Sequence, residues 1–258
     1  MVSSKLAPGL ALVALAAARD IPAGVKTVYD AIVNKGECAN VLADGFLSID
    51  DGDDSYGYCG DLMDKYGIMY IQGTGGNLAN MDIDCDGIPD GPGDDGRCGS
   101  SDDTQYETAF KEDVQEFGIE DLNSFVHDYV VFGNYGEADG YITYDPEQDG
   151  VRPLSVMAVV CGDKLVYGIW GDTNGDDGNP LVGEASISLA SRCFGKEDIN
   201  GDSGYDGQDV LYIAFTGDDA APGAELDWEA ETSDAFQESL QAYGDALIAR
   251  FENGASKL

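Results

Sequence analysis

The part of this chain that most restricts its fold is a pair of apolar segments joined by two turn residues. Residues 153–161 read P-L-S-V-M-A-V-V-C, a continuous apolar run that is typical of a strand buried on both faces. Gly162 and Asp163 follow as a tight turn, and residues 164–170 return as the partner strand. Because this hairpin has so little polar surface, we expect it to lie inside a larger sheet.

Other periodic segments complete the expected fold. Residues 25–35 and 233–253 space their apolar side chains as amphipathic helices do. Further strands are expected at 46–49, 67–71, 129–133, 140–144 and 209–215, and a helix is expected to start at Glu184. Together these elements predict a β-rich α+β fold with a mixed, barrel-like β core, peripheral helices and stabilising disulfides.

The N-terminal segment predicts export. Lys5 precedes an apolar run that ends in small residues at Ala16 and Ala18, which suits a signal peptidase. The run is too short and too rich in alanine to suggest a membrane span. We therefore expect a signal peptide at 1–18, a secreted, extracellular protein, and a single domain at 19–258, since we find no internal repeat or linker.

Six cysteines fit an exported chain, because an even number there indicates a disulfide framework. No pair has the C-x-x-C spacing of a zinc or redox site. Proximity in sequence favours Cys85 with Cys98. Cys161 with Cys193 would tie the apolar strand to the segment after the next loop, and Cys38 with Cys59 is what remains.

The charge restricts the partners. Fifty acidic residues against 13 basic ones give a formal net charge of −37. Such a field repels nucleic acid and anionic membranes and concentrates cationic ligands. We therefore expect neither nucleic acid nor membrane as a partner, although solubility in an acidic medium would explain the same composition.

Two acids bracket the loop after the hairpin. Asp172 follows the second strand and Glu184 opens the expected helix. Hydrolysis of a glycosidic bond needs one carboxylic acid to protonate the leaving oxygen and one carboxylate to activate water, so this pair is the candidate catalytic site. Spacing alone is weak evidence in a chain with 50 acids. Within the loop, Asn174 and Asp176 are candidate substrate-binding residues.

Aromatic residues beside these acids are further candidates for substrate binding. Trp170 and Tyr167 offer flat rings on which a sugar could stack. G-D-S-G at 201–204 resembles the nucleophile segment of chymotrypsin-like proteases, but His127, the only histidine, lacks that family's flanking residues. We interpret Ser203 as a turn residue and His127 as a packed or surface histidine.

A second run of acids suggests calcium as an alternative. Asp82, Asp84, Asp86, Gly87 and Asp90 occupy positions one, three, five, six and nine of an EF-hand-like loop, although the acid at position twelve is missing. Residues 198–209 match the same pattern in part. This alternative is a secreted calcium-binding module without catalysis, and the plainer interpretation is an acidic loop held by a disulfide.

Several separated motifs together resemble the fungal chitosanases of glycoside hydrolase family 75, from about residue 29 to the C-terminal helix. They are N-M-D-I-D-C-D-G, D-D-G-R-C-G-S-S, D-T-Q, Y-G-I-W-G-D-T-N-G, V-G-E-A-S-I-S-L-A and D-V-L-Y-I-A-F. The resemblance implies endo-acting, inverting hydrolysis of β-1,4 bonds between glucosamine units of chitosan. It makes the two essential carboxylates Asp172 and Glu184, and it favours a disulfide-held loop over a calcium site at D-I-D-C-D-G.

The expected protein is thus a monomeric chitosanase without cofactor or metal, whose partner is a cationic polysaccharide. We expect Glu184, on a structured element, to be the general acid and Asp172 the base, and the reverse assignment stays open. A hydrolase of another β-glycan, such as chitin, is the enzymatic alternative. It is disfavoured because an uncharged polymer gains nothing from the acidic field.

Overall fold

The computed structural model describes residues 19–49, 52, 55–88, 90–99, 101, 104–175 and 178–253. The expected signal peptide at 1–18 and the candidate Asp176 lie outside these residues. Within them, no helix combines the length and the apolar character that a membrane crossing requires.

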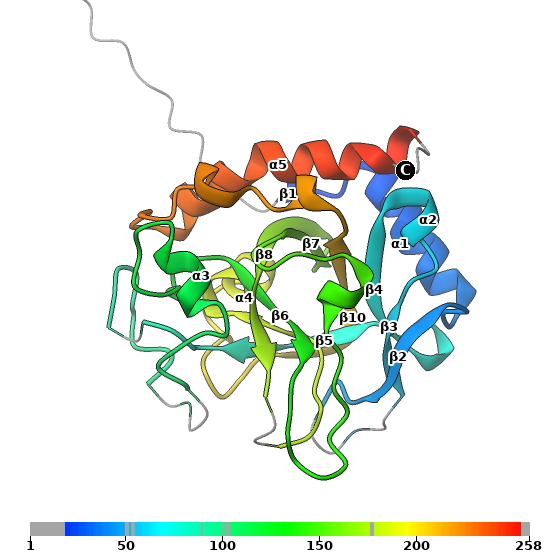
Figure 1. Cartoon of the computed structure of the whole chain (residues 1–258), viewed down its shortest axis with the longest axis horizontal. Helices are drawn as coiled ribbons and strands as arrows, with labels where there is room; N and C mark the ends of the chain where they lie inside the picture. The colour runs from blue at the N-terminus through cyan, green and yellow to red at the C-terminus, as the bar shows by residue number, and fades with distance from the viewer. Residues whose placement is uncertain are drawn as a thin grey trace, which may run out of the picture.

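The described residues form a ten-stranded mixed sheet (Figure 1). Its strands are β1 Arg19–Asp20, β2 Val41–Phe46, β3 Tyr56–Cys59, β4 Ile68–Gly73, β5 Ala79–Asp84, β6 Tyr129–Asn134, β7 Val156–Cys161, β8 Lys164–Asn174, β9 Glu184–Ser186 and β10 Tyr205–Phe215. They are ordered β1-β8-β6-β9-β5-β10-β4-β3-β2, and β7 pairs with both β8 and β10. The pairings β6–β8 and β5–β9 are parallel. The expected β-rich α+β fold with peripheral helices is confirmed.

The helices lie around this sheet (Figure 1). They are α1 Ala23–Lys35, α2 Met63–Tyr66, α3 Lys111–Gln115, α4 Ile187–Phe194 and α5 Ser233–Asn253. The two amphipathic helices expected from periodicity are α1 and α5, which pack against each other. Phe236 and Leu240 of α5 are fully buried, so its apolar stripe faces the core as its spacing predicts.

The apolar hairpin is present as β7 and β8. Their register runs from Val156 opposite Ile169 to Cys161 opposite Lys164, and every residue of β7 is buried. Gly162 and Asp163 both have positive φ, as a tight hairpin turn requires. Strand β8 continues beyond the expected end to Asn174, so Asp172 belongs to the strand and not to the loop.

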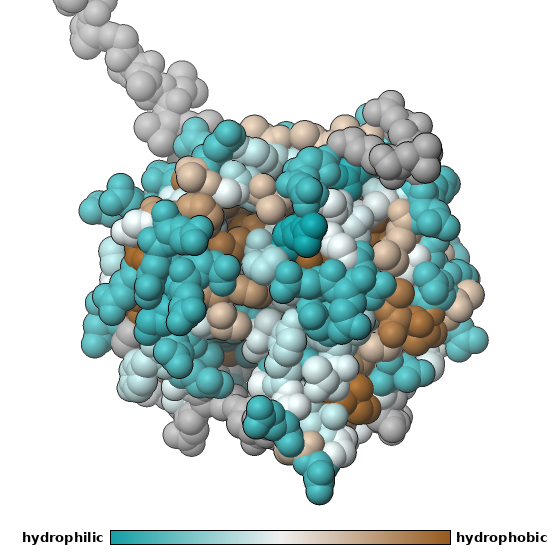
Figure 2. All heavy atoms as spheres, viewed as in Figure 1, coloured by the Kyte–Doolittle hydropathy of each residue, from teal (hydrophilic) through white to brown (hydrophobic). Residues whose placement is uncertain are grey.

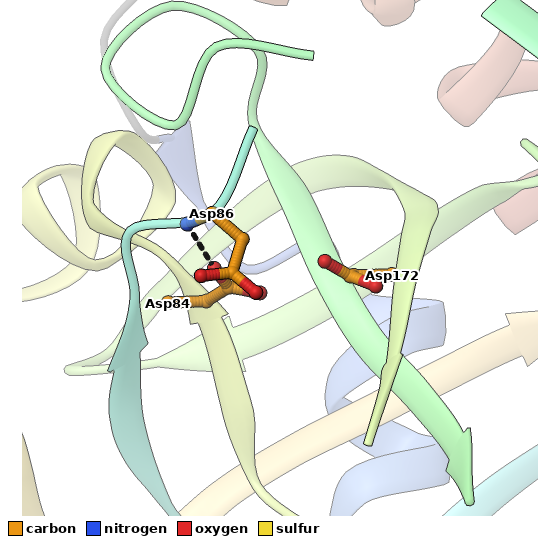
Figure 3. Close-up of side chains that lie close together, drawn as sticks. All are labelled: Asp84, Asp86 and Asp172. Atoms are coloured by element: carbon orange, nitrogen blue, oxygen red, sulfur yellow. Dashed lines mark hydrogen bonds between the residues drawn. The ribbon is translucent and has the colours of Figure 1, made fainter. Parts of the chain in front are cut away.

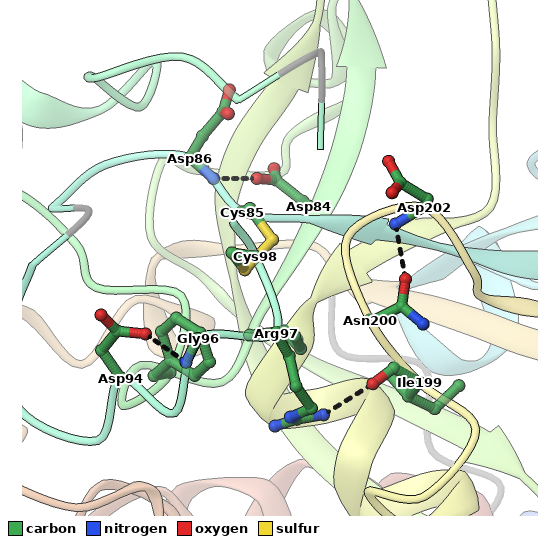
Figure 4. Close-up of a disulfide and its surroundings, with 12 residues drawn as sticks. Asp84, Cys85, Asp86, Asp94, Gly96, Arg97, Cys98, Ile199, Asn200 and Asp202 are labelled. Carbon is green, nitrogen blue, oxygen red and sulfur yellow. Dashed lines mark hydrogen bonds between the residues drawn. A yellow bond between two sulfur atoms is a disulfide. The ribbon is translucent and has the colours of Figure 1, made fainter. Parts of the chain in front are cut away.

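The three disulfides are Cys85–Cys98, which sequence proximity favours, Cys161–Cys193, which ties the apolar strand to α4, and the remaining pair, Cys38–Cys59. Cys85–Cys98 fixes the segment that follows β5 (Figure 4). In the same region, Arg97 Nη1 donates to the carbonyl of Ile199 at 3.0 Å. The end of β5 is therefore held from two sides.

Glu184 is not the start of a helix, as expected, but the first residue of β9. This strand pairs with β5 on one side and β6 on the other, so its backbone groups find partners that a local pattern cannot reveal. Helix α4 begins at Ile187, and the hydroxyl of Ser186 caps it by accepting from Leu189 N at 3.4 Å.

Three other expectations are wrong. Strand β2 ends at Phe46 instead of covering 46–49, and residues 140–144 contribute a single bridge, Asn134 with Tyr144. The acids Asp82 and Asp84 lie in extended strand β5 and not in the expected disulfide-held loop, and this extended backbone also excludes the alternative of an EF-hand-like loop there.

A buried charge ties two helices to the start of β6. Asp128, which is fully buried, accepts from Arg192 Nε of α4 at 2.8 Å. It also accepts from Gln237 Nε2 and Ser233 Oγ of α5, at 2.7 and 2.8 Å. Because a buried carboxylate is stable only when it is paired, these contacts fix α4 and α5 against the strand that carries the site.

Candidate active site

The register of the sheet brings Asp172 and Glu184 to the two sides of one residue. Val131 of β6 is the partner of Asp172 in β8 and of Glu184 in β9. Neighbouring strands lie about 4.8 Å apart, so the Cα atoms of the two acids are separated by about 10 Å across β6. The acids that bracket a loop in sequence therefore face each other over a single intervening strand.

A bulge in β8 directs Asp172 away from the core. Trp170 pairs with Val130 and Asp172 with Val131, so β8 has one extra residue, Gly171, at this point. A side chain at Gly171 would meet Tyr129 Cβ at 2.5 Å and Leu122 Cδ1 at 2.8 Å, which explains why glycine occupies the bulge.

Two adjoining cavities make a polar groove over this part of the sheet. The lining of the first includes Asp84, Asp86, Gln105, Asp172, Asn174 and Glu184. The lining of the second includes Asp82, Asn174, Asn179, Glu184, Asp202 and Ser203. Glu184 and Asn174 belong to both, so they lie where the two halves of the groove meet.

Backbone amides hold the carboxylate of Asp172. Its Oδ1 accepts from Ala109 N at 2.9 Å and from Thr173 N at 2.7 Å. Its Oδ2 is buried and has no hydrogen-bond partner among the described residues. One oxygen is thus fixed by two amides, and the other is enclosed without a donor among the described residues.

Glu184 is less enclosed and has weaker partners. It is partly exposed, and its Oε2 accepts from Asn174 Nδ2 at 3.4 Å, near the limit of hydrogen-bond length. Asn174 also accepts from the Tyr141 hydroxyl at 3.2 Å. The predicted site residue Asn174 therefore lies in the groove and bridges Glu184 to the neighbouring segment.

Two further acids stand beside Asp172 (Figure 3). Asp84 and Asp86 come from the end of β5, and one oxygen of each lies within 4.8 Å of the other and of Asp172. Asp84 Oδ1 accepts from the Tyr129 hydroxyl at 2.8 Å and from Asp86 N at 2.6 Å. Asp86 Oδ1 accepts from Gln105 N at 2.6 Å.

This concentration of negative charge favours protonated acids. Burial, followed by the charge of Asp84, raises the pKa of Asp172 well above its ordinary value. Burial, followed by the charges of Asp84 and Asp82, raises the pKa of Glu184 in the same direction. A carboxyl group with a raised pKa can donate a proton at a pH where an ordinary glutamate is ionised.

The two predicted aromatic contacts are corrected. Trp170 is fully buried: its ring packs edge-on against Phe110 and its Nε1 donates to the carbonyl of Asp172 at 3.0 Å. Tyr167 is 2% exposed and donates to Asp245 of α5 at 2.8 Å. Neither ring is available for stacking on a sugar, so we assign both to the packing that supports β8.

His127 is a packed residue, as predicted, and plays no part in the groove. Its Nδ1 accepts from Asn123 N at 2.8 Å, and its Nε2 therefore donates to the carbonyl of Trp228 at 3.0 Å. Burial lowers its pKa to about 4. Ser203 lies in the turn before β10, where it bridges to Asn200, which is also as predicted.

Sequence reasoning missed Asp84 and Asp86 as neighbours of Asp172. The alternation of acids in D-I-D is a signal for a strand with one polar face, whereas the sequence alone favours a disulfide-held acidic loop, with a calcium loop as the alternative. It also missed two exposed rings next to residues of the groove. Tyr106 is 74% exposed and follows Gln105, and Tyr135 is 40% exposed and donates its backbone N–H to Asn174.

The outer surface agrees with the acidic composition. On the face shown in Figure 2, hydrophilic residues cover most of the area and hydrophobic ones form small separate groups. This face therefore has the mixed polar surface that is usual for a globular protein.

Two carboxyl groups on either side of a groove, with raised pKa values, are the arrangement that glycoside hydrolases use for catalysis. A sequence model of the fungal chitosanases of glycosyl hydrolase group 75 matches residues 81–250. An endo-chitosanase of Aspergillus oryzae is 44% identical over 241 residues, which are 93% of this chain and 95% of the relative. An endo-chitosanase of Aspergillus fumigatus is 46% identical over the same shares.

Endo-chitosanase C of Aspergillus oryzae is 34% identical over 172 residues, 66% of this chain and 38% of that protein. The chain belongs to the fungal chitosanases of glycosyl hydrolase group 75, which confirms the family inferred from the motifs.

Proposed function

We propose that this protein is an endo-chitosanase that hydrolyses β-1,4 bonds between glucosamine units with inversion, using Asp172 and Glu184. The observation that carries the proposal is their pairing with Val131, which brings the two motif acids to one groove from separate strands. The endo-chitosanase relatives, which match 93% of the chain, support chitosan as the substrate.

Glu184 is the general acid and Asp172 the general base in this proposal. Glu184 gives its proton to the glycosidic oxygen as the bond from that oxygen to the anomeric carbon breaks. Asp172 takes a proton from the water whose oxygen forms the new bond to the anomeric carbon. Two short hydrogen bonds from backbone amides stabilise the ionised form of Asp172. Glu184 accepts a longer one, at 3.4 Å, from the side-chain amide of Asn174. This difference supports the assignment.

The separation of the two acids supports inversion. Inverting glycosidases hold their carboxyl groups about 6.5–9.5 Å apart to leave room for water, and retaining ones about 5–5.5 Å apart. The Cα atoms of Asp172 and Glu184 lie about 10 Å apart across β6, which is compatible with the larger separation of carboxyl groups. A water molecule between Asp172 and the sugar then attacks from the face opposite Glu184.

The acidic field suits a polycation. Chitosan is protonated in weak acid, so a net charge of −37 attracts it and increases the rate of encounter. An uncharged polymer such as chitin gains nothing from this field.

Several wider expectations complete the proposal. We propose that residues 1–18 are a signal peptide, and that residues 19–258 form one secreted, monomeric catalytic domain. We also propose that β5 to β10 close into a barrel, which the pairing of β7 with both β8 and β10 supports. Asp176 remains a candidate for substrate binding.

Release of reducing ends from fully deacetylated chitosan tests the function. The wild type should cleave it, and Asp172→Asn and Glu184→Gln should each lose about 100-fold or more of kcat while keeping a folded structure. Near-wild activity in either variant removes that residue from the mechanism. Activity on chitin but not on chitosan would instead support the other glycan. No hydrolysis with a large calcium-dependent rise in melting temperature would support the binding module.

A further inference from the structure

The acidic cluster of Asp84, Asp86 and Asp172 has the geometry of a ligand site. Figure 3 shows the carboxylate of Asp172 in β8 across from the two that come from the end of β5. One oxygen from each lies within 4.8 Å of the others. The cluster lines the same cavity as Glu184, so a ligand held there lies next to the reacting bond.

Neutral groups of the protein fix each of the three carboxylates. The Tyr129 hydroxyl and Asp86 N donate to Asp84, and Gln105 N donates to Asp86. Ala109 N and Thr173 N donate to Asp172. Each carboxylate is therefore oriented by at least one neutral donor.

One buried oxygen in the cluster lacks a donor. Asp172 is 5% exposed, and its Oδ2 is enclosed without a hydrogen-bond partner among the described residues. An acceptor that is removed from water and left unpaired is unfavourable, and more so beside like charges. A positively charged donor would relieve both conditions at once.

The spacing of the oxygens admits an ammonium group. Three acceptors at about 2.8 Å from a tetrahedral nitrogen lie about 4.6 Å from one another. Ligands at right angles around Mg²⁺ or Ca²⁺ lie about 3.0–3.5 Å apart. The three oxygens lie within 4.8 Å of one another, which admits either ligand, and the endo-chitosanase relatives favour the ammonium.

We propose that Asp84, Asp86 and Asp172 bind the C2 ammonium group of a glucosamine unit adjoining the cleaved bond, an inference that rests on the proposed function. An N-acetyl group at the same place is neutral and larger, so it would bring no positive charge to the cluster. The cluster therefore selects a deacetylated sugar on one side of the bond. The bound ammonium also keeps Asp172 ionised, as a general base must be.

Cleavage of partially acetylated chitosan, followed by identification of the sugars at both new chain ends, tests this site. Asp86→Asn and Asp84→Asn keep an oxygen for the amide and hydroxyl donors while they remove a charge. Asp64→Asn, an exposed acid on α2, is the matched control for loss of one charge. Melting temperatures verify that each variant is folded. If one of the two variants does not fold, the other still tests the site.

The wild type and the control should leave only glucosamine at one of the two new ends. Asp86→Asn or Asp84→Asn should admit acetylated units at that end and raise KM for fully deacetylated chitosan by about ten- to a hundred-fold. End composition that is unchanged in both folded variants overturns the proposal, even if their pH profile shifts. Loss of wild-type activity with a chelator and its recovery with calcium also overturns it, in favour of a divalent-cation site.

The two failures can be told apart. If the wild type releases no reducing ends from fully deacetylated chitosan, the proposed function fails and the ammonium site with it. If it releases them but leaves acetylated units at both new ends as often as they occur in the polymer, the ammonium site alone fails.

Discussion

Replacement of Asp172 by asparagine should stabilise the free protein at neutral pH while it abolishes activity. In Asp172→Asn, the new side chain would keep an Oδ1 that accepts from Ala109 N and Thr173 N. In place of the unpartnered Oδ2 it would present an amide that can donate to Asp84 or Asp86. The substitution thus removes a buried like charge and satisfies a buried polar position.

The size of the effect follows from the spacing of the cluster. Two like unit charges no more than 4.8 Å apart repel by about 3.5 kcal/mol or more at an effective dielectric constant near 20. The cluster binds protons before the full repulsion develops, so the expected gain in the free energy of unfolding is about 1–3 kcal/mol at pH 7. In a chain of this length that gain corresponds to a rise of about 2–10 °C in melting temperature.

The pH dependence identifies the cause. Folding raises the pKa of Asp172, so its ionisation destabilises the native state progressively as pH rises from the unfolded value, about 3.9, to the raised one. Thermal unfolding of wild type, Asp172→Asn and the control Asp64→Asn at pH 7 and pH 3 measures this. The gain should be present at pH 7 and nearly absent at pH 3. A lower melting temperature at pH 7, or an equal gain at both pH values, would refute the electrostatic reasoning.

Three further predictions concern the packing and the rim of the groove. Trp170→Phe should lower the melting temperature, because it removes a buried hydrogen bond and leaves a void, but it should leave KM unchanged in steady-state assays. Tyr106→Ala should do the opposite, raising KM by about two- to tenfold through lost stacking with no change in melting temperature. Replacing Cys161 and Cys193 by serine releases a cross-link over 32 residues, so denaturant titration should show a loss of about 3–4 kcal/mol.

The parts of the fold that could be predicted from sequence are those with a repeated pattern. The β7–β8 hairpin contains two long apolar strands, and α5 repeats its apolar residues over several helical turns. Both elements form where the sequence predicts them. Strand β5 was missed because its acids, Asp82 and Asp84, are typical of a loop, although they line a groove from one face of a strand. Strand β9 has three residues, too few for a pattern, and its partners lie far away in the sequence.

The candidate site divides in the same way. Asp172 and Glu184 could be found from local motifs, whereas their partners depend on which distant segments meet. Trp170 was misassigned because proximity in sequence to Asp172 suggested a shared environment. The bulge at Gly171 places the ring in the core and the carboxylate in the groove.

In the proposed mechanism, Asp172 and Glu184 act across β6, too far apart for a covalent intermediate. Proton NMR of fully deacetylated chitosan during the first turnovers of the wild type tests it most directly, because the anomeric signals of the new reducing ends are resolved before mutarotation. Inversion requires that the α anomer forms first, since water attacks a β-linked sugar from the opposite face. Initial formation of the β anomer would contradict it.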